Sequence, residues 1–259
     1  MPGEDVVSLF GLSIRNVTLP EAAAMLVTDA QAGTRRQVNF VNAHCVNVGA
    51  RDGSYLKALR ESDLLFADGS GMRLAARLAG LDLRDNVNGT DLFPLLCEAA
   101  AAAGVGVALL GARPGVAQRC GDNMMARFPG LKVVWAHHGY LQDVDTQALV
   151  ESVNASGAGL LFVAMGVPMQ ELWIARHADA LRPPVLLGVG ALFDFYSGEV
   201  SRAPALVRRW GLEWVYRFLL EPRRMFTRYI LGNPLFIGRT LARRALGRQV
   251  LRHSPLLRD

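Results

Sequence analysis

Short apolar runs alternate with longer segments of helical periodicity over the first two hundred residues. The predicted strands are residues 38–41, 63–67, 105–110, 132–136, 159–165 and 184–189. The predicted helices are residues 43–59, 72–78, 91–103, 116–128, 147–155 and 169–180. Strands buried on both faces lose the period-two pattern, which is typical of a parallel sheet covered by helices. The sequence therefore predicts an α/β fold with a Rossmann-like, doubly wound, mostly parallel sheet.

The pattern changes after residue 202. Apolar side chains at mostly three- and four-residue spacing, interleaved with arginines, predict an amphipathic helix over residues 203–220, ended by Pro222. A second mixed stretch covers residues 223–231, is broken at 232–234, and gives way to a third over 235–251. We expect a core of residues 1–202 and an arginine-rich helical appendage of residues 203–259.

Composition narrows the class of protein. With 51% hydrophobic residues among 259, the chain can bury a sizeable core, which excludes a disordered protein. Three scattered cysteines do not form a disulfide framework or a CxxC metal site. The acidic start lacks the features of a signal peptide, and the longest near-apolar run, residues 99–111, is too short to span a membrane. We expect a cytoplasmic protein that is not integral to the membrane.

Positive charge is concentrated at one end of the chain. Residues 201–259 hold 13 arginines and 3 acidic residues, whereas the whole protein carries a net charge of only +5. The arginine guanidinium is a planar fork suited to phosphate. The appendage is therefore expected to face an anionic partner, namely a nucleic acid, anionic lipid or a phosphorylated substrate.

Polar or glycine-rich loops follow the predicted strands, and in such sheets ligands bind beyond the carboxyl ends of the strands. Asp68, beside Gly69 and Gly71, could act as a general base, although spacing alone favours a helix-capping or turn aspartate. Asn42 could hydrogen-bond a sugar or base, or cap the next helix. His44 could be a ligand or an acid, although packing against that helix is the more frequent role of such a histidine. These loops make a nucleotide or sugar-phosphate site plausible.

Two further loops are candidates for ligand contacts. The turn that begins at Gly111 precedes a helix and could cradle a phosphate, although any strand-to-helix turn can look like this. Gln170 could reach a ligand at the strand edge, with Glu171 a capping-type carboxylate at the helix start. Neither GxGxxG nor GxxxxGK[ST] occurs, which argues against a nicotinamide-dependent oxidoreductase and a P-loop protein.

A metal site is not expected. The histidines have no regular ligand spacing. One DxD, formed by Asp143 and Asp145, precedes a predicted helix, where a helix cap with an acidic first turn explains it better than a divalent-cation site.

Several segments together resemble the WecG/TagA/CpsF family of bacterial glycosyltransferases. The resemblance covers roughly residues 35–235, and its order and spacing are more specific than any one motif. The matching segments are NFVNAH (39–44), SDLLFADGSG (62–71), NGTDL (88–92), LLGARPGVA (109–117), HGY (138–140), MGVPMQELW (165–173), GVGALFDFYSG (188–198), RAP (202–204), GLEWVYR (211–217), EPRR (221–224) and RY (228–229).

The resemblance implies an inverting, metal-independent transfer without a cofactor. A sugar would move from a UDP-sugar to a polyprenyl-pyrophosphate-linked glycan at the inner face of the membrane, in cell-surface or exopolysaccharide biosynthesis. The implied base is Asp68, and Asn42 and Gln170 are the implied pocket residues. The appendage would close over the site and bring arginines to the leaving diphosphate, at positions that correspond here to Arg217, Arg224 and Arg228.

Departures from the family pattern concern the donor sugar. Phe40 replaces a frequent threonine, Asn86 stands where an arginine is usual, and Thr227 precedes Arg228 in place of a double arginine. Phe40 and Asn86 fit a branch other than the N-acetylmannosamine transferases, such as the related exopolysaccharide glucosyltransferases. A nucleic-acid-binding protein with an arginine-rich arm is the main alternative, which the acidic core and the aromatic side chains of the appendage make weaker; a homo-oligomer stays open.

Overall fold

The computed structural model describes residues 5–142, 144–204, 207, 210, 213–220, 222 and 226–245. The strands are β1 (Val6–Leu9), β2 (Leu12–Arg15), β3 (Arg36–Val41), β4 (Leu64–Ala67), β5 (Gly106–Gly111), β6 (Lys132–His137), β7 (Leu160–Ala164) and β8 (Val185–Gly188). The helices of the core are α1 (Leu19–Ala32), α2 (Ala43–Gly49), α3 (Gly53–Arg60), α4 (Ser70–Leu78), α5 (Gly89–Ala103), α6 (Val116–Arg127), α7 (Thr146–Ala155), α8 (Met169–His177) and α9 (Leu192–Tyr196). The C-terminal segment contributes α11 (Glu213–Leu220), the π-helix η1 (Phe226–Leu231) and α13 (Gly232–Ala245).

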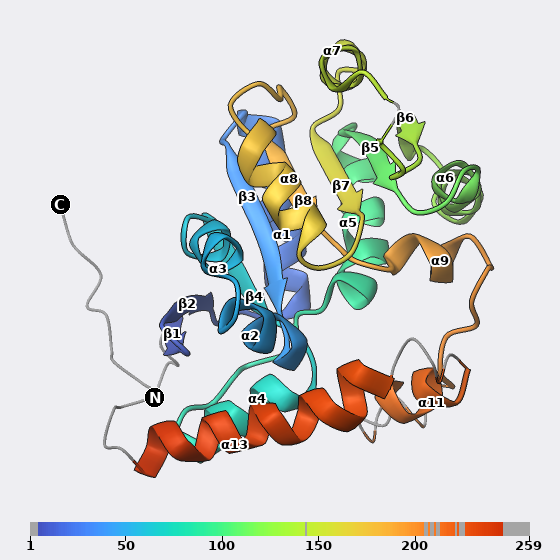
Figure 1. Ribbon diagram of the computed structural model, residues 1–259. Coiled ribbons are helices and arrows are strands. Elements are labelled where there is room, and N and C mark those ends of the chain that lie inside the picture. The colour runs from blue at the N-terminus through green and yellow to red at the C-terminus, as the bar shows by residue number, and fades with distance from the viewer. Residues whose placement is uncertain are drawn as a thin grey trace, which may run out of the picture.

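Six strands form one parallel sheet in the order β4-β3-β8-β7-β5-β6. The chain runs outward from β3 to β4 on one side and builds the other side from the later strands, so the sheet is doubly wound, as the sequence predicts. In Figure 1 the arrowheads of β3 and β8 point to the end of the molecule where α2, α4 and α13 lie. The loops that follow these strands therefore gather at that end.

Each face of the sheet is buried by a different group of helices. Alternate strand residues pack with α1, α5 and α6 into the largest core cluster, in which Phe93 and Phe162 meet edge to face with ring centroids 4.9 Å apart. The opposite face is covered by α7 and α8 over β5, β7 and β8, and by α2, α3, α4 and the β1–β2 hairpin beside β3 and β4. This double covering explains why the strands read as continuous apolar runs.

The sequence-based elements need several corrections. The short helix α9 was not predicted, and the helix predicted over residues 203–220 is not continuous, because Ala203 and Pro204 are not helical, Trp210 lies in a turn and α11 covers Glu213–Leu220. The antiparallel β1–β2 hairpin and α1 were not predicted, although Thr18 and Glu21 form a capping box at the start of α1. The helix predicted over residues 43–59 is in fact two helices, because Asp52 accepts hydrogen bonds from Ser54 N and Tyr55 N and starts α3 anew. Residues 232–234 do not break the C-terminal helix but open α13, since proline is tolerated in a first helical turn.

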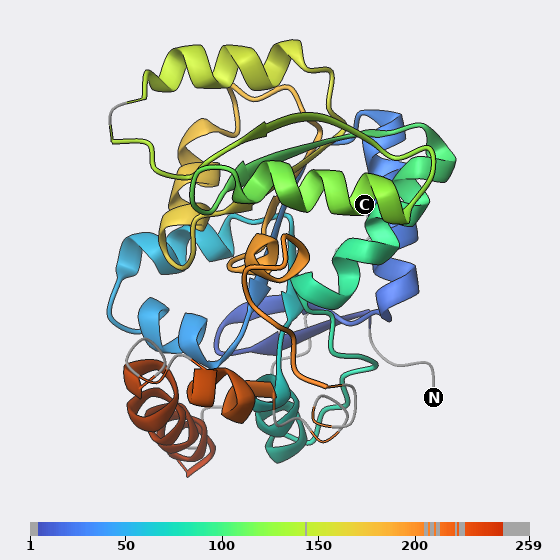
Figure 2. The same cartoon turned by 90° about the vertical axis from the view of Figure 1, so that its right-hand side faces the viewer.

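The C-terminal segment packs against the core at the end where the strand loops gather. Helix α13 contacts α2 and α4, and Asn47 Nδ2 donates to the Gly232 carbonyl at 2.8 Å. Phe236 is 2% exposed and lies against Phe10, with ring centroids 5.3 Å apart. Figure 2, seen from the side, places α11 and α13 together at this end. Among the described residues no helix is both long and apolar enough to span a membrane.

Candidate functional site

A cavity of about 840 Å³ opens at the carboxyl edge of the sheet, above β4, β3, β8 and β7. Its walls are the loops that follow these strands, the start of α5, and the C-terminal segment. The residues that line it include Phe40, Asn42, His44, Asp68, Gly69, Gly71, Asn86, Gln170, Gly188, Gly190, Trp214 and Phe236. Five predicted site residues, Asn42, Asp68, Gly69, Gly71 and Gln170, are thus brought to one cavity.

Asp68 and Asn42 meet because their strands are neighbours. Val41 pairs with Ala67 at the last register position of β3 and β4, so the next residue of each strand enters the cavity side by side. Asn42 Nδ2 donates to Asp68 Oδ2 at 3.0 Å. The Asn42 oxygen accepts from the backbone N–H groups of His44 and Cys45 at the start of α2, which orients the amide. Asn42 is therefore both the helix cap and a partner of the carboxylate.

The turn after Asp68 is held by a hydrogen bond to Asn86, which lies in the loop before α5. Gly69 has a φ of +90°, a conformation that favours glycine, and its N–H donates to Asn86 Oδ1 at 2.6 Å. A β-carbon on Gly71 would lie 3.3 Å from Ala43 Cβ and 3.5 Å from the Phe236 ring. Both glycines thus serve the geometry of the site, because one allows the turn and the other lets the C-terminal segment approach closely.

Gln170 holds two loops together at the floor of the cavity. Its oxygen accepts from Gly166 N at 3.2 Å and from Gly190 N at 2.8 Å, which joins the loop after β7 to the loop after β8. Its Nε2 donates to Glu171 Oε1 at 3.0 Å. Burial raises the pKa of the Glu171 carboxyl to about 7. An ionisable group of shifted proton affinity therefore lies directly behind the cavity.

Helix starts give the cavity a positive electrostatic character. Three helices of nine or more residues, α4, α5 and α8, contribute residues of their first turns to the lining. Within the described part of the chain, no side chain caps α4 or α8. In the first turn of α8 the Gln170 N–H donates to the Gly166 carbonyl at 3.1 Å. Helix N-termini attract anions through backbone N–H groups and the helix dipole. The arrangement favours a ligand that carries a phosphate or diphosphate.

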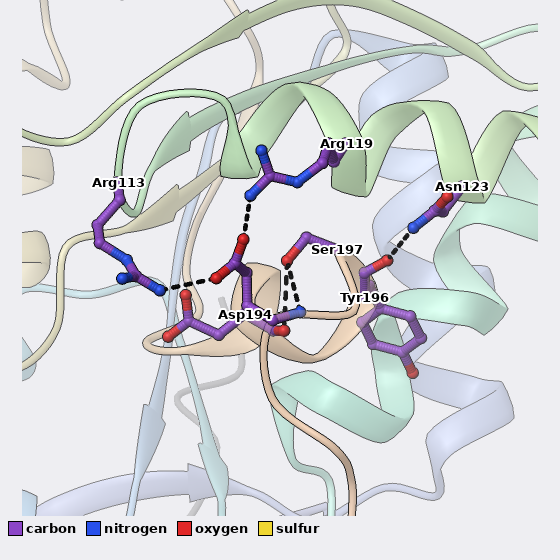
Figure 3. A network of polar contacts seen from close by, with 7 residues as sticks. Arg113, Arg119, Asn123, Asp194, Tyr196 and Ser197 are labelled. Atoms are coloured by element: carbon purple, nitrogen blue, oxygen red, sulfur yellow. Dashed lines mark hydrogen bonds and ion pairs between the residues drawn. The ribbon is translucent and has the colours of Figure 1, made fainter.

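Contacts with α5 and α6 position helix α9, which forms one wall of the cavity. Glu199, just after α9, forms ion pairs with Arg113 and Arg119, the first at 2.9 Å (Figure 3). Asn123 Nδ2 donates to the Tyr196 carbonyl at 2.9 Å, and the Tyr196 hydroxyl donates to the Thr90 carbonyl at 2.7 Å. These contacts tie α9 to α6 and α5, and so position the loop that precedes α9 along the cavity.

Other predicted site residues lie elsewhere. Gly111 ends β5 outside the cavity lining, and a β-carbon there would lie 2.4 Å from the Ala164 carbonyl oxygen, so strand packing accounts for this glycine. The side chains of Arg217 and Arg228 and the whole of Arg224 lie outside the described residues.

Asp145 caps α7 through Gln147 N and Ala148 N, as the capping interpretation of the DxD predicts, whereas Asp143 lies outside the described residues. No cluster of three metal-ligating side chains occurs among the described residues.

Some lining residues escaped the sequence-based site prediction. Asn86 drew attention only as a departure from the family pattern, and its contact with Gly69 shows a local role that spacing could not reveal. Trp214 and Phe236 line the cavity from the C-terminal segment. Their aromatic character was the available signal in the sequence.

Comparison with known proteins agrees with this architecture. The model of the glycosyl transferase WecG/TagA/CpsF family matches residues 7–250. A relative from Bacillus spizizenii (strain ATCC 23059 / NRRL B-14472 / W23) is 32% identical over 187 residues, which are 72% of this chain and 71% of the relative. One from Staphylococcus aureus (strain NCTC 8325 / PS 47) is 27% identical over 221 residues, or 85% and 86% of the two chains. Both are named N-acetylglucosaminyldiphosphoundecaprenol N-acetyl-beta-D-mannosaminyltransferase. The chain belongs to the WecG/TagA/CpsF family of glycosyltransferases.

Proposed function

We propose that this enzyme transfers a hexose or N-acetylhexosamine from a UDP-sugar to a sugar carried on a polyprenyl diphosphate, with inversion at the anomeric carbon. The observation that carries the proposal is the Asp68 carboxylate, held by Asn42 at 3.0 Å in a cavity where three longer helices begin. The names of the two relatives supply the class of acceptor.

Asp68 acts as the general base in this proposal. Its carboxylate takes the proton of the acceptor hydroxyl, whose oxygen attacks the anomeric carbon from the face opposite UDP. The new glycosidic bond forms as the bond to the UDP oxygen breaks. The Asn42 amide, anchored by the start of α2, keeps the carboxylate oriented toward the cavity.

The leaving diphosphate gains negative charge as its bond breaks, and groups that bind this charge lower the barrier. The N-terminal ends of α4, α5 and α8 lie at the cavity, and their helix dipoles are proposed to attract this charge. Among the described lining residues, His44 is the one with a basic side chain. Arg217, Arg224 and Arg228 are the residues that we propose to complete the site. They belong to the arginine-rich segment whose described part already forms one cavity wall.

The segment of residues 203–259 is proposed to act as an appendage that joins membrane docking to closure of the site. Exposed apolar side chains accompany its many arginines, at Leu219, Phe226, Ile230, Leu231, Ile237 and Leu241. Such a combination suits a bilayer surface that carries anionic lipid. Trp214, Ile230 and Phe236 line the cavity at the same time, so a docked appendage would present the cavity to a lipid-linked acceptor.

A transfer assay with a panel of UDP-sugars tests the proposal. Purified protein is incubated with a polyprenyl-diphosphate-linked N-acetylglucosamine acceptor, and product is separated by chromatography. We expect transfer from one UDP-hexose or UDP-N-acetylhexosamine, and a loss of about 10²–10⁴-fold in rate for Asp68→Asn with unchanged thermal stability. Phe40 and Asn86 both line the cavity. The identity of the donor that reacts therefore tests whether these two residues mark a branch other than the N-acetylmannosamine transferases.

Two outcomes would refute the proposal. The first is the absence of transfer and of UDP binding alongside tight, salt-dependent binding of nucleic acid, which would favour the nucleic-acid alternative. The second is a near wild-type rate for Asp68→Asn, which would remove Asp68 as the base.

A further inference from the structure

Glu171 is a buried ionisable side chain for which the transfer reaction has no direct use. It lies in the first turn of α8 and is 1% exposed. Its Oε1 accepts from Gln170 Nε2 at 3.0 Å, while Oε2 is buried without a hydrogen-bond partner among the described residues. Burying a carboxyl is costly unless hydrogen bonds compensate it. The role of the Glu171 carboxyl is therefore sought in its contact with Gln170.

The neighbour, Gln170, has a demanding hydrogen-bond geometry. Its oxygen receives two backbone N–H groups, from Gly166 and Gly190, so a rotation of the amide by 180° would turn donors against donors. The Nε2 group then points into the protein, where Glu171 Oε1 accepts from it. Without that acceptor a buried N–H would be left unpaired, which destabilises the folded protein by the desolvation cost of that group.

Close packing leaves little room for the amide to move. A β-carbon on Gly188 would lie 2.4 Å from Asn39 Oδ1, 3.2 Å from Gln170 Nε2 and 3.4 Å from Gln170 Cγ. Asn39 is itself held, because its Nδ2 donates to Ser62 Oγ at 2.9 Å. Gln170 therefore rests on the bare backbone of β8, and its hydrogen-bond partners decide its orientation.

We propose that Glu171 is a positioning residue, whose carboxyl holds the Gln170 amide in the orientation that joins the two glycine loops of the donor cavity. This inference rests on the proposed function, since the cavity is taken to bind the UDP part of the donor. Gln170 lines the cavity and Glu171 does not. Glu171 thus acts through Gln170 and does not touch the ligand.

Two substitutions separate the hydrogen bond from the volume of the side chain. Glu171→Met keeps an unbranched chain of similar length but offers no comparable acceptor, whereas Glu171→Gln retains an oxygen that accepts from Gln170 Nε2. A matched control exists on α7, where Gln147 Nε2 donates to Glu151 Oε1 at 2.9 Å on the exposed surface. Glu151→Met removes the same kind of pair away from the cavity.

Two readouts are measured on the full-length chain. Amide hydrogen exchange of Gly166 and Gly190, followed by NMR, reports the two loops without any ligand. Titration calorimetry with UDP reports affinity. For Glu171→Met we expect about tenfold faster exchange at both glycines and about tenfold weaker UDP binding, within the range for a buried unpaired donor. Glu171→Gln is expected to stay within about threefold of wild type on both readouts, and Glu151→Met to match wild type.

The inference is overturned if Glu171→Met behaves like Glu151→Met, or if Glu171→Gln is as impaired as Glu171→Met. If Glu171→Met does not fold by itself, the double variant Gln170→Met/Glu171→Met is compared with Gln170→Met, because neither protein has an amide at position 170 that needs an acceptor. A UDP affinity lower in the double variant than in Gln170→Met would also overturn the inference. A wild-type protein that binds no UDP would refute the proposed function, while the exchange rates would still decide the role of Glu171.

Discussion

Replacing the buried carboxyl of Glu171 by an amide is expected to change how stability depends on pH. Burial raises the pKa of this group from 4.5 to about 7 in the folded protein. Below pH 4.5 the carboxyl is neutral in the folded and unfolded states and costs nothing. As pH rises from 4.5 to 7, the unfolded chain loses the proton first, so wild-type stability falls. Above pH 7 the loss is complete and amounts to about 3 kcal/mol.

The Glu171→Gln variant lacks this titration. Its free energy of unfolding should therefore equal that of wild type near pH 4.5 and exceed it by about 3 kcal/mol at pH 8. For a chain of this size, that difference corresponds to a rise in melting temperature of roughly 6–12 °C. Thermal unfolding is followed by circular dichroism for both proteins between pH 4.5 and 8.5 at constant ionic strength. The difference between the two curves removes the titrations that they share.

A difference in melting temperature that stays constant between pH 5 and pH 8 would refute the reasoning, since it would mean that Glu171 titrates alike in both states. Glu151→Gln serves as the control. Its carboxylate is exposed on α7, so the difference from wild type should stay within about 0.5 kcal/mol across the range.

Four further predictions follow from the structure. Gly188→Ala should lower the free energy of unfolding by about 2 kcal/mol, because a β-carbon would meet Asn39 Oδ1 at 2.4 Å; urea unfolding checks this against Gly53→Ala, whose β-carbon would meet nothing within 4 Å. Phe236→Ala should cost about 3 kcal/mol in the same assay, and a neutral result would contradict the packing of α13 on the core. Deletion of residues 203–259 should abolish transfer while far-ultraviolet circular dichroism still shows a folded α/β core, and an active truncation would refute the role of the appendage. Transfer should survive EDTA, and a strict Mg²⁺ requirement would count against arginines as the groups that meet the leaving charge.

The local pattern of the chain was sufficient for most elements of the core. All six strands of the parallel sheet were predicted, because a strand buried on both faces is an apolar run whatever its neighbours are. The ends of these strands also pointed to Asn42, Asp68 and Gln170, since ligands bind at carboxyl edges of parallel sheets. The hairpin and α1 were missed even though the capping box at Thr18 marks the start of α1.

The order of the strands was decided only by the tertiary structure. Hydrophobic periodicity reports that a residue is buried but not which distant segment buries it. Placing β3 beside β4 brings Asn42 to Asp68, and placing β7 beside β8 lets Gln170 join two loops. The same packing leaves Gly111 outside the cavity and brings Phe236 into its wall. The sequence alone therefore determined the strands of the parallel sheet and the candidate chemistry, whereas contacts between segments far apart in the chain determined which residues share the site.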